Sequence, residues 1–315
     1  MATLQDVAKK ANVSKMTVSR TINHPETVSD EVKELVHQAM KELNYTPNIA
    51  ARALTQNKTQ IIKVCVLEEM TEAEPHYVYF LIGISKQLEK YNYSLQLVTT
   101  KSINIGNCDG YIIAGARQND LSWIEKLTKP VIFFGENKAG FPFVDSDNYE
   151  GSCIATEYAV KRGYEHIVFV GIDLDEPFEI SREQGYLSVM QQYNMPTQII
   201  RLTNHSHVAQ DYICTNWRKF SKNTVFICSS DRIALGIERG IKKYSGNIPF
   251  DYGVIGHDGV FLDKIASPKL TTIQQDLGLA GKECVELLMK KLLQPENSLN
   301  PTIIEPQLVI QESTK

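Results

Sequence analysis

Hydrophobic residues in the first 60 positions recur at steps of three and four, the spacing of one face of an α-helix. Three helices are predicted, beginning after Thr3, Ser14 and Ser29, whose side chains can cap a helix start. Pro47 ends the third. A further short helix is predicted over residues 48–54, before a polar linker at 56–60. The inward sets are Leu4, Val7, Ala8 and Ala11; Val18 and Ile22; and Val32, Leu35, Val36, Ala39, Met40 and Leu43.

From Ile61 onward, short apolar runs alternate with amphipathic stretches, which favours parallel sheets covered by helices on both faces. About 255 residues of this pattern predict two doubly wound lobes with a ligand cleft at the strand C-termini. The predicted strands are Ile61–Leu67, Ser94–Thr99, Tyr111–Ala114, Val131–Phe134, His166–Gly171, Thr224–Cys228 and Gly253–Gly256. The predicted helices are Phe80–Tyr91, Asp120–Leu127, Tyr149–Arg162, Arg182–Tyr193, Val208–Phe220 and Asp231–Tyr244.

Composition narrows the class of protein. The chain is 43% hydrophobic, and no window approaches the 18 or so apolar residues of a membrane span. The N-terminus lacks the pattern of a secretory signal, so we expect a cytoplasmic protein that does not associate with a membrane. The six cysteines are widely spaced and several lie in apolar runs, which favours buried thiols over disulfides or a zinc site.

The charge is divided unevenly along the chain, whose net charge is −4. Residues 1–58 hold eight Lys/Arg and six Asp/Glu, whereas residues 59–315 hold 25 and 31. Because phosphates repel an acidic surface, any DNA contact is expected from the N-terminal head rather than the body.

The head carries a long motif. Residues 3–20 read TLQDVAKKANVSKMTVSR, followed by VS at 28–29 and ELNYTPN at 42–48. This pattern resembles the head of the LacI/GalR family of bacterial repressors. The resemblance continues in family order through the body, at GYEHI (163–167), DRIALG (231–236), VIGHD (254–258) and LTTI (270–273).

The resemblance implies an α/β protein with an N-terminal helix-turn-helix head and a two-lobed periplasmic-binding-protein-like body of doubly wound parallel sheets. The domains expected are a DNA-binding head (1–47), a hinge helix and linker (48–59) and an effector-binding and dimerisation body (60–315). Within the body, the N-lobe is expected over about 60–146 with 276–303, and the C-lobe over about 148–274 with 306–315.

A second helix that starts at a serine cap can place its first residues against base edges in the major groove. By resemblance, Lys15, Met16 and Arg20 take the base-reading positions, and Arg20 suits a guanine. Leu54 is placed as a minor-groove wedge in the hinge NIAARAL (48–54), which pairs with a partner's hinge on DNA. The alternatives are an ordinary solvated helix face and a Leu54 that packs against the body. The remaining implied contacts are Ser14, Thr17, Ser19, Asn23, Ser29, Tyr45, Asn48 and Ala51.

The resemblance also implies effector contacts in the body. Arg182 suits a hydroxyl pair, a carboxylate or a phosphate, Asp258 would accept from effector hydroxyls, and Phe178 could stack on a sugar face. The alternatives are that Asp231 caps a helix, Asp258 caps a turn and Phe178 is packing. The remaining implied contacts are Glu68, Glu69, Asp147 and Asp231.

The sequence departs from the family pattern at three places. Ser230 stands where many relatives have Asn, and Gly135 ends a strand where a carboxylate is frequent. Between Thr99 and Asn107 there are only a few residues where the family has room for a helix, so we expect a trimmed first lobe.

Other classes fit less well. The chain has no Gly-x-x-x-x-Gly-Lys-Ser/Thr, His-Glu-x-x-His or Gly-x-Ser-x-Gly motif, so no enzyme is expected. His205 and His207 are interpreted as part of a polar loop rather than a metal site, and no cofactor is predicted. A transport-type sugar-binding protein would lack the head, and an architectural DNA protein would lack the body. A cytosolic sugar-binding module and a protein-controlled regulator without a small-molecule effector remain as alternatives.

We therefore predict a homodimeric transcriptional repressor of a pseudo-palindromic operator. A sugar or sugar phosphate between the lobes would shift their closure and order or melt the hinges. The expected coupling to DNA affinity is about 1–3 kcal/mol. A tetramer is not expected, because the C-terminus ends at Lys315 without a heptad tail.

Overall fold

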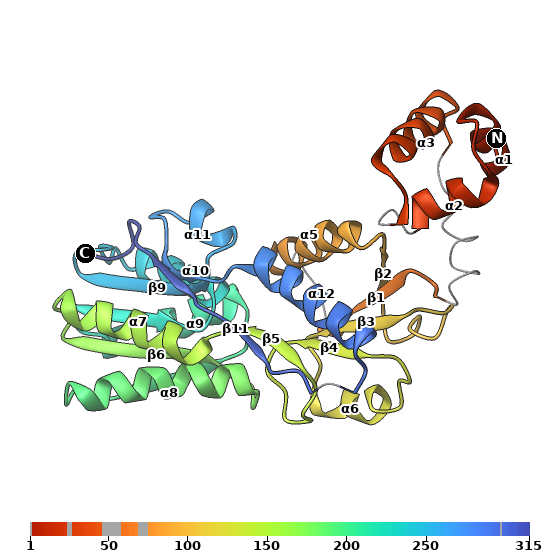
Figure 1. Ribbon diagram of the computed structural model, residues 1–315. Helices are drawn as coiled ribbons and strands as arrows, with labels where there is room; N and C mark the ends of the chain where they lie inside the picture. Colours follow the sequence, from red (N-terminus) through yellow and green to blue (C-terminus); the bar gives the residue numbers. More distant parts are fainter. Residues whose placement is uncertain (1, 24–26, 46–57, 69–74, 297) are drawn as a thin grey trace. The chain divides into compact units, whose positions relative to one another are not determined.

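The computed structural model describes residues 2–23, 27–45, 58–68, 75–296 and 298–315. The chain forms two compact units, a head (Met1–Gln60) and a body (Ile61–Lys315), which are described separately (Figure 1). The predicted hinge at 48–59 falls mostly outside the described residues, so its bounds stay a prediction.

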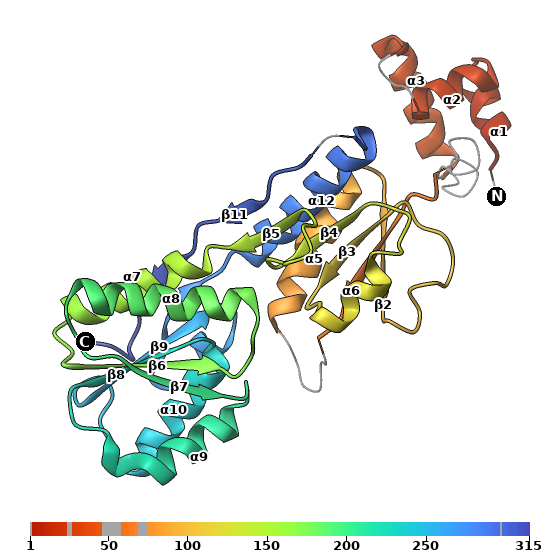
Figure 2. The same ribbon diagram turned by 90° about the horizontal axis from the view of Figure 1, so that it is seen from below.

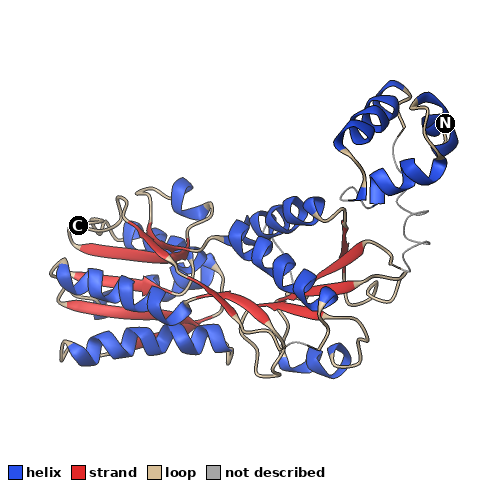
Figure 3. Cartoon of the chain, in the orientation of Figure 1, coloured by secondary structure: helices blue, strands red, loops and turns tan. Residues whose placement is uncertain are grey.

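In the head, the described elements are helices, with no strand among them (Figure 3). They are α1 (Leu4–Lys10), α2 (Lys15–Asn23) and α3 (Asp30–Glu42). Two of the three predicted caps form: the amide of Thr3 donates to Asp6 Oδ2 at 2.8 Å in a capping box, and the Thr17 amide donates to Ser14 Oγ at 3.0 Å. Ser29 precedes α3, but its side chain makes no capping bond. Val7, Val18 and Val36 meet in the core between the helices.

The N-lobe of the body is a six-stranded sheet in the order β11-β5-β4-β3-β1-β2, with all described pairs parallel. Its strands are β1 (Ile61–Val66), β2 (Ser94–Val98), β3 (Gly110–Ala114), β4 (Val131–Phe134), β5 (Phe143–Ser146) and β11 (Thr302–Ile304). Its helices are α5 (Pro75–Lys90), α6 (Gln118–Ile124) and α12 (Leu277–Leu293).

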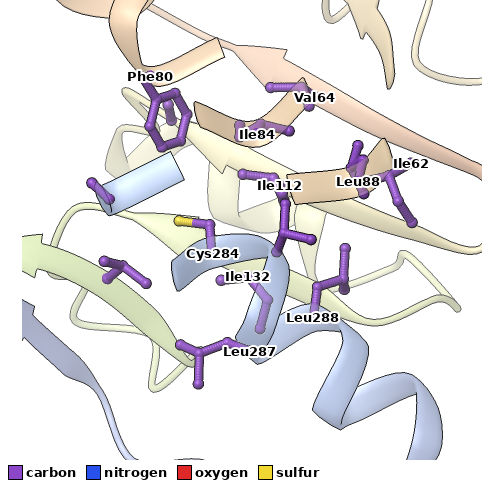
Figure 4. Packing of buried hydrophobic residues seen from close by; sticks show 14 of the residues in the cluster. Ile62, Val64, Phe80, Ile84, Leu88, Ile112, Ile132, Cys284, Leu287 and Leu288 are labelled. Atoms are coloured by element: carbon purple, nitrogen blue, oxygen red, sulfur yellow. The ribbon is translucent and has the colours of Figure 1, made fainter. Parts of the chain in front are cut away.

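Helices α5 and α12 lie side by side over one face of this sheet (Figure 2). Their buried side chains pack on Ile112 and Ile132 of the strands (Figure 4). The two helix backbones touch at glycines: a Cβ at Gly83 would lie 2.2 Å from the Gly278 carbonyl oxygen, and one at Gly281 would lie 2.3 Å from that of Phe80. Any larger residue would force the helices apart.

The C-lobe is a second six-stranded sheet in the order β12-β10-β9-β8-β6-β7, parallel except for β12. Its strands are β6 (His166–Ile172), β7 (Gln198–Leu202), β8 (Thr224–Cys228), β9 (Tyr252–Asp258), β10 (Thr271–Gln274) and β12 (Gln307–Val309). Its helices are α7 (Asn148–Lys161), α8 (Pro177–Gln192), α9 (Ser206–Asn216), the 3₁₀ turn η2 (Trp217–Lys219), α10 (Asp231–Lys243) and α11 (Leu262–Ile265).

The chain passes between the lobes three times: from β5 to α7, from β10 to α12, and from β11 to β12. Three parallel connections of this kind allow the lobes to rotate about a hinge while their sheets stay intact. None of the described helices is both long and apolar enough to cross a membrane.

The trimmed segment after β2 folds as a series of turns over residues 100–106, without a helix. Lys63, in the middle of β1 and only 1% exposed, holds this segment: its Nζ donates to the carbonyl oxygens of Ile103 at 2.6 Å and Gly106 at 2.8 Å. Burying an ammonium is costly unless it is hydrogen-bonded, so Lys63 and the turns depend on each other.

Lys63→Met is therefore expected to destabilise the protein by about 1–3 kcal/mol, because the buried Ile103 carbonyl loses a charged donor. Amide exchange measured by mass spectrometry should speed up across residues 99–108 and stay unchanged in the C-lobe. Lys101→Met, at an exposed position of the same segment, is the control. Equal exchange in the two variants would contradict a clamping role for Lys63.

Candidate DNA-binding helix and interlobe cleft

Helix α2 of the head has one face packed inside and one face open to solvent. Val18 and Thr21 are buried, whereas Lys15 and Arg20 are exposed and Met16 is 65% exposed. An apolar side chain with this exposure on a small basic domain has no packing role within the head. The face thus presents Lys15 and Met16 in the first turn of α2 and Arg20 in its last turn.

Short hydroxyl side chains flank this face. Ser14 and Thr17 share a hydrogen bond of 2.8 Å between their hydroxyl oxygens, and both can still reach a further acceptor or donor. Ser29 precedes α3 as its N-cap residue, but its side chain makes no capping bond. Ser19 is half-buried on the same helix.

The other predicted head contacts differ in position. Tyr45 is half-buried and packs on the head core, so its ring has a structural role. Asn23 ends α2, and its side chain is not described. Asn48, Ala51 and Leu54 of the predicted hinge lie outside the described residues, as does Glu69 of the body.

In the body, a cavity of about 590 Å³ lies between the two lobes. The residues that line it follow the C-terminal ends of strands in both sheets: Glu68 after β1, the segment 115–118 after β3, Ser229 after β8 and Asp258 at the end of β9. Two facing sheet edges therefore build it, as expected for doubly wound lobes. Of the predicted effector contacts, it brings together Glu68, Phe178, Arg182 and Asp258.

Arg182 is the best-anchored of these residues and is 6% exposed. Its Nε donates to Asn148 Oδ1 at 2.8 Å, and Nη1 donates to the Ser229 carbonyl oxygen at 2.6 Å. The guanidinium lies over the Phe178 ring at 5.1 Å from its centroid. Phe178 thus supports the arginine as well as lining the cavity, and the remaining guanidinium N–H groups are left for a ligand.

Buried carboxyls surround this arginine. Burial raises the pKa of Asp145 and of Glu179, while the Arg182 charge works against that rise in both. Asp145 lines the cavity and accepts amide hydrogens from Glu136 at 2.9 Å and Ser146 at 2.7 Å. The positive charge of Arg182 therefore favours the ionised forms of these two buried acids.

Asp258 stands where the two lobes and the β10–α12 crossover meet. Its Oδ1 accepts from Gln275 Nε2 at 3.2 Å and lies 3.8 Å from His76 Nδ1 of the N-lobe. Its backbone φ is +131°, a conformation that L-residues rarely adopt and that costs of order 1–3 kcal/mol. The Asp258 carboxylate therefore contacts the N-lobe and the crossover from the C-lobe at one point.

Asp147 and Asp231 do not reach the cavity lining, so the structure gives no support to their predicted effector contacts. Asp147 caps α7, accepting the Glu150 amide at 2.9 Å. The cap of α10 is Ser230, and Asp231 follows it inside the core. Burial raises the Asp231 pKa to about 7. Thr272 and Gly259 donate to its carboxylate, at 2.6 and 2.8 Å. Both aspartates therefore have structural roles here.

Sequence reasoning missed several cavity residues. His76 and Tyr77 come from the start of α5, Arg117 from the start of α6, and Asn204 from the loop after β7. Asn204 follows β7, a strand that was not predicted from the sequence, although a strand between the predicted helices 182–193 and 208–220 would have continued the β/α alternation. No local pattern marks His76 or Arg117, because only the meeting of the lobes gives them a role.

Comparisons with known proteins agree with this architecture. Residues 3–48 match the model of the bacterial regulatory proteins of the lacI family, and residues 156–314 match a periplasmic binding protein-like domain. A Bacillus subtilis (strain 168) protein named an uncharacterized HTH-type transcriptional regulator, YvdE, is 49% identical over the full length of both chains.

Two solved structures share the fold. The complex of the transcriptional regulator CelR with cellobiose has a TM-score of 0.75 at 23% identity, covering 99% of this chain and 100% of that one. The lac repressor dimer bound to operator and the anti-inducer ONPF has a TM-score of 0.77 at 22% identity, covering 99% of each chain. With the helix-turn-helix head, the two parallel sheets and a full-length relative at 49% identity, this chain belongs to the lacI family of bacterial DNA-binding transcriptional regulators.

Proposed function

We propose that this regulator is a repressor whose operator affinity changes when a neutral sugar of about two rings binds in the interlobe cleft. The observation that carries the proposal is the cavity of about 590 Å³ between two lobes that are joined by three crossovers. A ligand held by both lobes gains binding energy only in one lobe arrangement, so its binding shifts that arrangement.

The lining suits carbohydrate chemistry. Planar polar groups that can pair with adjacent hydroxyls, such as Arg182, Asn204 and Asp258, stand beside the aromatic rings of Phe134 and Phe178. The volume exceeds what one sugar ring fills, and the similar CelR was solved with cellobiose. These features support a disaccharide.

The charges of the lining favour a neutral sugar over a sugar phosphate. Six carboxylates line the cavity, Glu68, Glu136, Asp145, Asp175, Glu176 and Asp258, against four Lys and Arg side chains. Three of the four cations are engaged: Arg182 with Asn148 and Ser229, Arg117 with two glutamates, and Arg232 with the Asn204 carbonyl oxygen. A phosphate would meet a net negative cleft and would have to break these contacts.

For the head, we propose that Lys15, Met16 and Arg20 read bases in the major groove. Arg20 can bond a guanine bidentately, and Met16 can contact a thymine methyl. Ser14, Thr17, Ser19, Asn23 and Ser29 are proposed as phosphate contacts that fix the register. Tyr45 is proposed to act from the head core, and Asn48, Ala51 and Leu54 to join the complex through a hinge helix in the minor groove.

We propose that the protein works as a homodimer. On α5, Val78, Tyr79 and Ile82 are each about half exposed, although they lie on one helix face. Phe261 and Ile265, at α11 of the other lobe, are similarly exposed. Apolar residues grouped in this way mark association surfaces. A two-fold dimer would place two heads on a pseudo-palindromic operator, as in the lac repressor dimer on its operator.

A thermal-shift screen of the full chain with a sugar panel tests the ligand. A disaccharide at 100 times its Kd should add about 2.7 kcal/mol to stability and raise the melting temperature, whereas glucose 6-phosphate should not. Asp258→Asn should reduce the shift, because the amide removes one acceptor for effector hydroxyls. The proposal fails if phosphorylated sugars shift the transition more than neutral ones do.

A further inference from the structure

Arg117 occupies the rim of the interlobe cavity at a point where the two lobes approach each other. It is the residue before α6 in the N-lobe, and it contacts one glutamate from each lobe. Its Nη2 lies 3.0 Å from Glu68 Oε1 in the N-lobe, and its Nη1 lies 3.5 Å from Glu176 Oε1 in the C-lobe. Glu176 is the residue before α8. One guanidinium therefore bridges the starts of two helices that belong to different lobes.

The N-lobe end of this bridge is fixed in place. Tyr77 donates its hydroxyl hydrogen to Glu68 Oε2 at 2.6 Å, which orients the glutamate toward Arg117. The Arg117 amide donates to Asp120 Oδ2 at 2.8 Å, which fixes the backbone. The contact with Glu176 is longer and crosses between lobes, so it is the part of the bridge that breaks when the lobes separate.

A second contact between the lobes joins His76 and Asp258 and differs in kind. Burial, together with the nearby Arg182 charge, lowers the pKa of His76 to about 4. The imidazole is therefore neutral at physiological pH, and its contact with Asp258 carries no ion-pair attraction. Arg117 and Glu176 form a partly exposed ion pair, so their attraction is screened by salt.

We propose that Arg117 is a tether that holds the lobes together at the cleft rim in the ligand-free protein and limits how often the cleft opens. The bridge is a partly exposed ion pair, so the expected effect of its removal is modest, about twofold to fivefold on the opening equilibrium. This role concerns the lobes alone and does not depend on which ligand the cleft takes.

Hydrogen exchange of the ligand-free full chain, followed by mass spectrometry, tests the tether. Arg117→Gln should speed exchange about twofold to fivefold in two regions, residues 115–121 of the N-lobe and residues 173–180 of the C-lobe. Glu176→Gln leaves the Glu68 contact intact, yet it should produce the same change on both sides. Both variants break the same Arg117–Glu176 contact. The exchange rates of the double variant should therefore equal those of the faster single variant within experimental error.

Arg201→Gln provides the matched control. Arg201 pairs with Glu183 at 2.6 Å, but both residues belong to the C-lobe, so removing this pair should leave exchange at the rim unchanged. Raising salt to about 1 M should bring the wild-type rates toward those of Arg117→Gln. The tether is refuted if Glu176→Gln leaves residues 115–121 unchanged, or if the effects of the two variants simply add.

Discussion

Arg20→Ala is expected to weaken binding of the full-length protein to its best duplex by about 1–3 kcal/mol, roughly fivefold to 150-fold, and to relax base preference at one position. Arg20 is exposed on α2, beside Lys15 and the largely exposed Met16. A guanidinium there can make two hydrogen bonds to a guanine edge, and alanine removes both without disturbing the buried Val18 side of the helix.

The measurement uses a duplex selected from a random pool by the wild-type protein, followed by a second selection with the variant. Lys33→Ala is the control, because Lys33 lies on α3 and its ammonium pairs with Asp30 at 2.8 Å. Lys33→Ala should weaken binding to all duplexes slightly and by the same factor, since it removes a positive charge but no base contact. Equal losses in the two variants, with an unchanged selected sequence, would refute base reading by Arg20.

Arg182→Met should lower the stability of the body by about 3 kcal/mol, which corresponds to a fall of roughly 6–12 °C in its melting temperature. Methionine matches much of the arginine stem but leaves the Ser229 carbonyl and the Asn148 amide without their donor. It also removes the positive charge that favours ionisation of the buried Asp145 and Glu179. Unpaired buried acids then protonate or destabilise the fold.

Calorimetry of the full chain, with Arg201→Met as the comparison, measures this effect. Arg201 also pairs with a glutamate of α8, but half of its side chain is exposed, so its loss should cost less than about 1 kcal/mol. The loss of stability in Arg182→Lys should lie between the losses in Arg182→Met and Arg201→Met. Lysine keeps the positive charge but lacks the planar guanidinium that makes both hydrogen bonds. An Arg182→Met variant with the same melting temperature as the wild type would contradict this role of Arg182.

The sequence predicted the class of fold because each lobe obeys local rules. The capping residues Thr3 and Ser14 begin the first two head helices as expected. Helix α8 begins at Pro177 rather than the predicted Arg182, since proline is favoured in a first helical turn. Helix α5 likewise begins at Pro75, five residues before its predicted start.

Some elements were not predicted, for reasons visible in the packing. Helix α12 contains Gly278 and Gly281, which weaken its helical signal. These glycines are required because the backbone of α5 passes against them. Strands β11 and β12 have three residues each, too few to show a period. Their positions come from pairing with distant strands.

The candidate site was predictable only in part. Arg182 and Asp258 stand at positions that a family pattern can carry, and both line the cavity. Asp231 was implied by the same resemblance, yet it turns inward to Thr272, because Ser230 takes the capping role at α10. Arg117 acquires a role only through Glu176, and that contact spans two lobes, so no local sequence pattern marks it.

The central claim is that one protein binds duplex DNA through its head and changes that affinity when a sugar occupies its cleft. The most direct test is a titration of the selected duplex with the full chain, with and without the disaccharide that gives the largest thermal shift. We expect the Kd for DNA to change at least fivefold in the wild type, which corresponds to about 1 kcal/mol of coupling, and to change less in Asp258→Asn at the same sugar concentration. A disaccharide that binds the cleft and leaves the DNA affinity unchanged would contradict the claim.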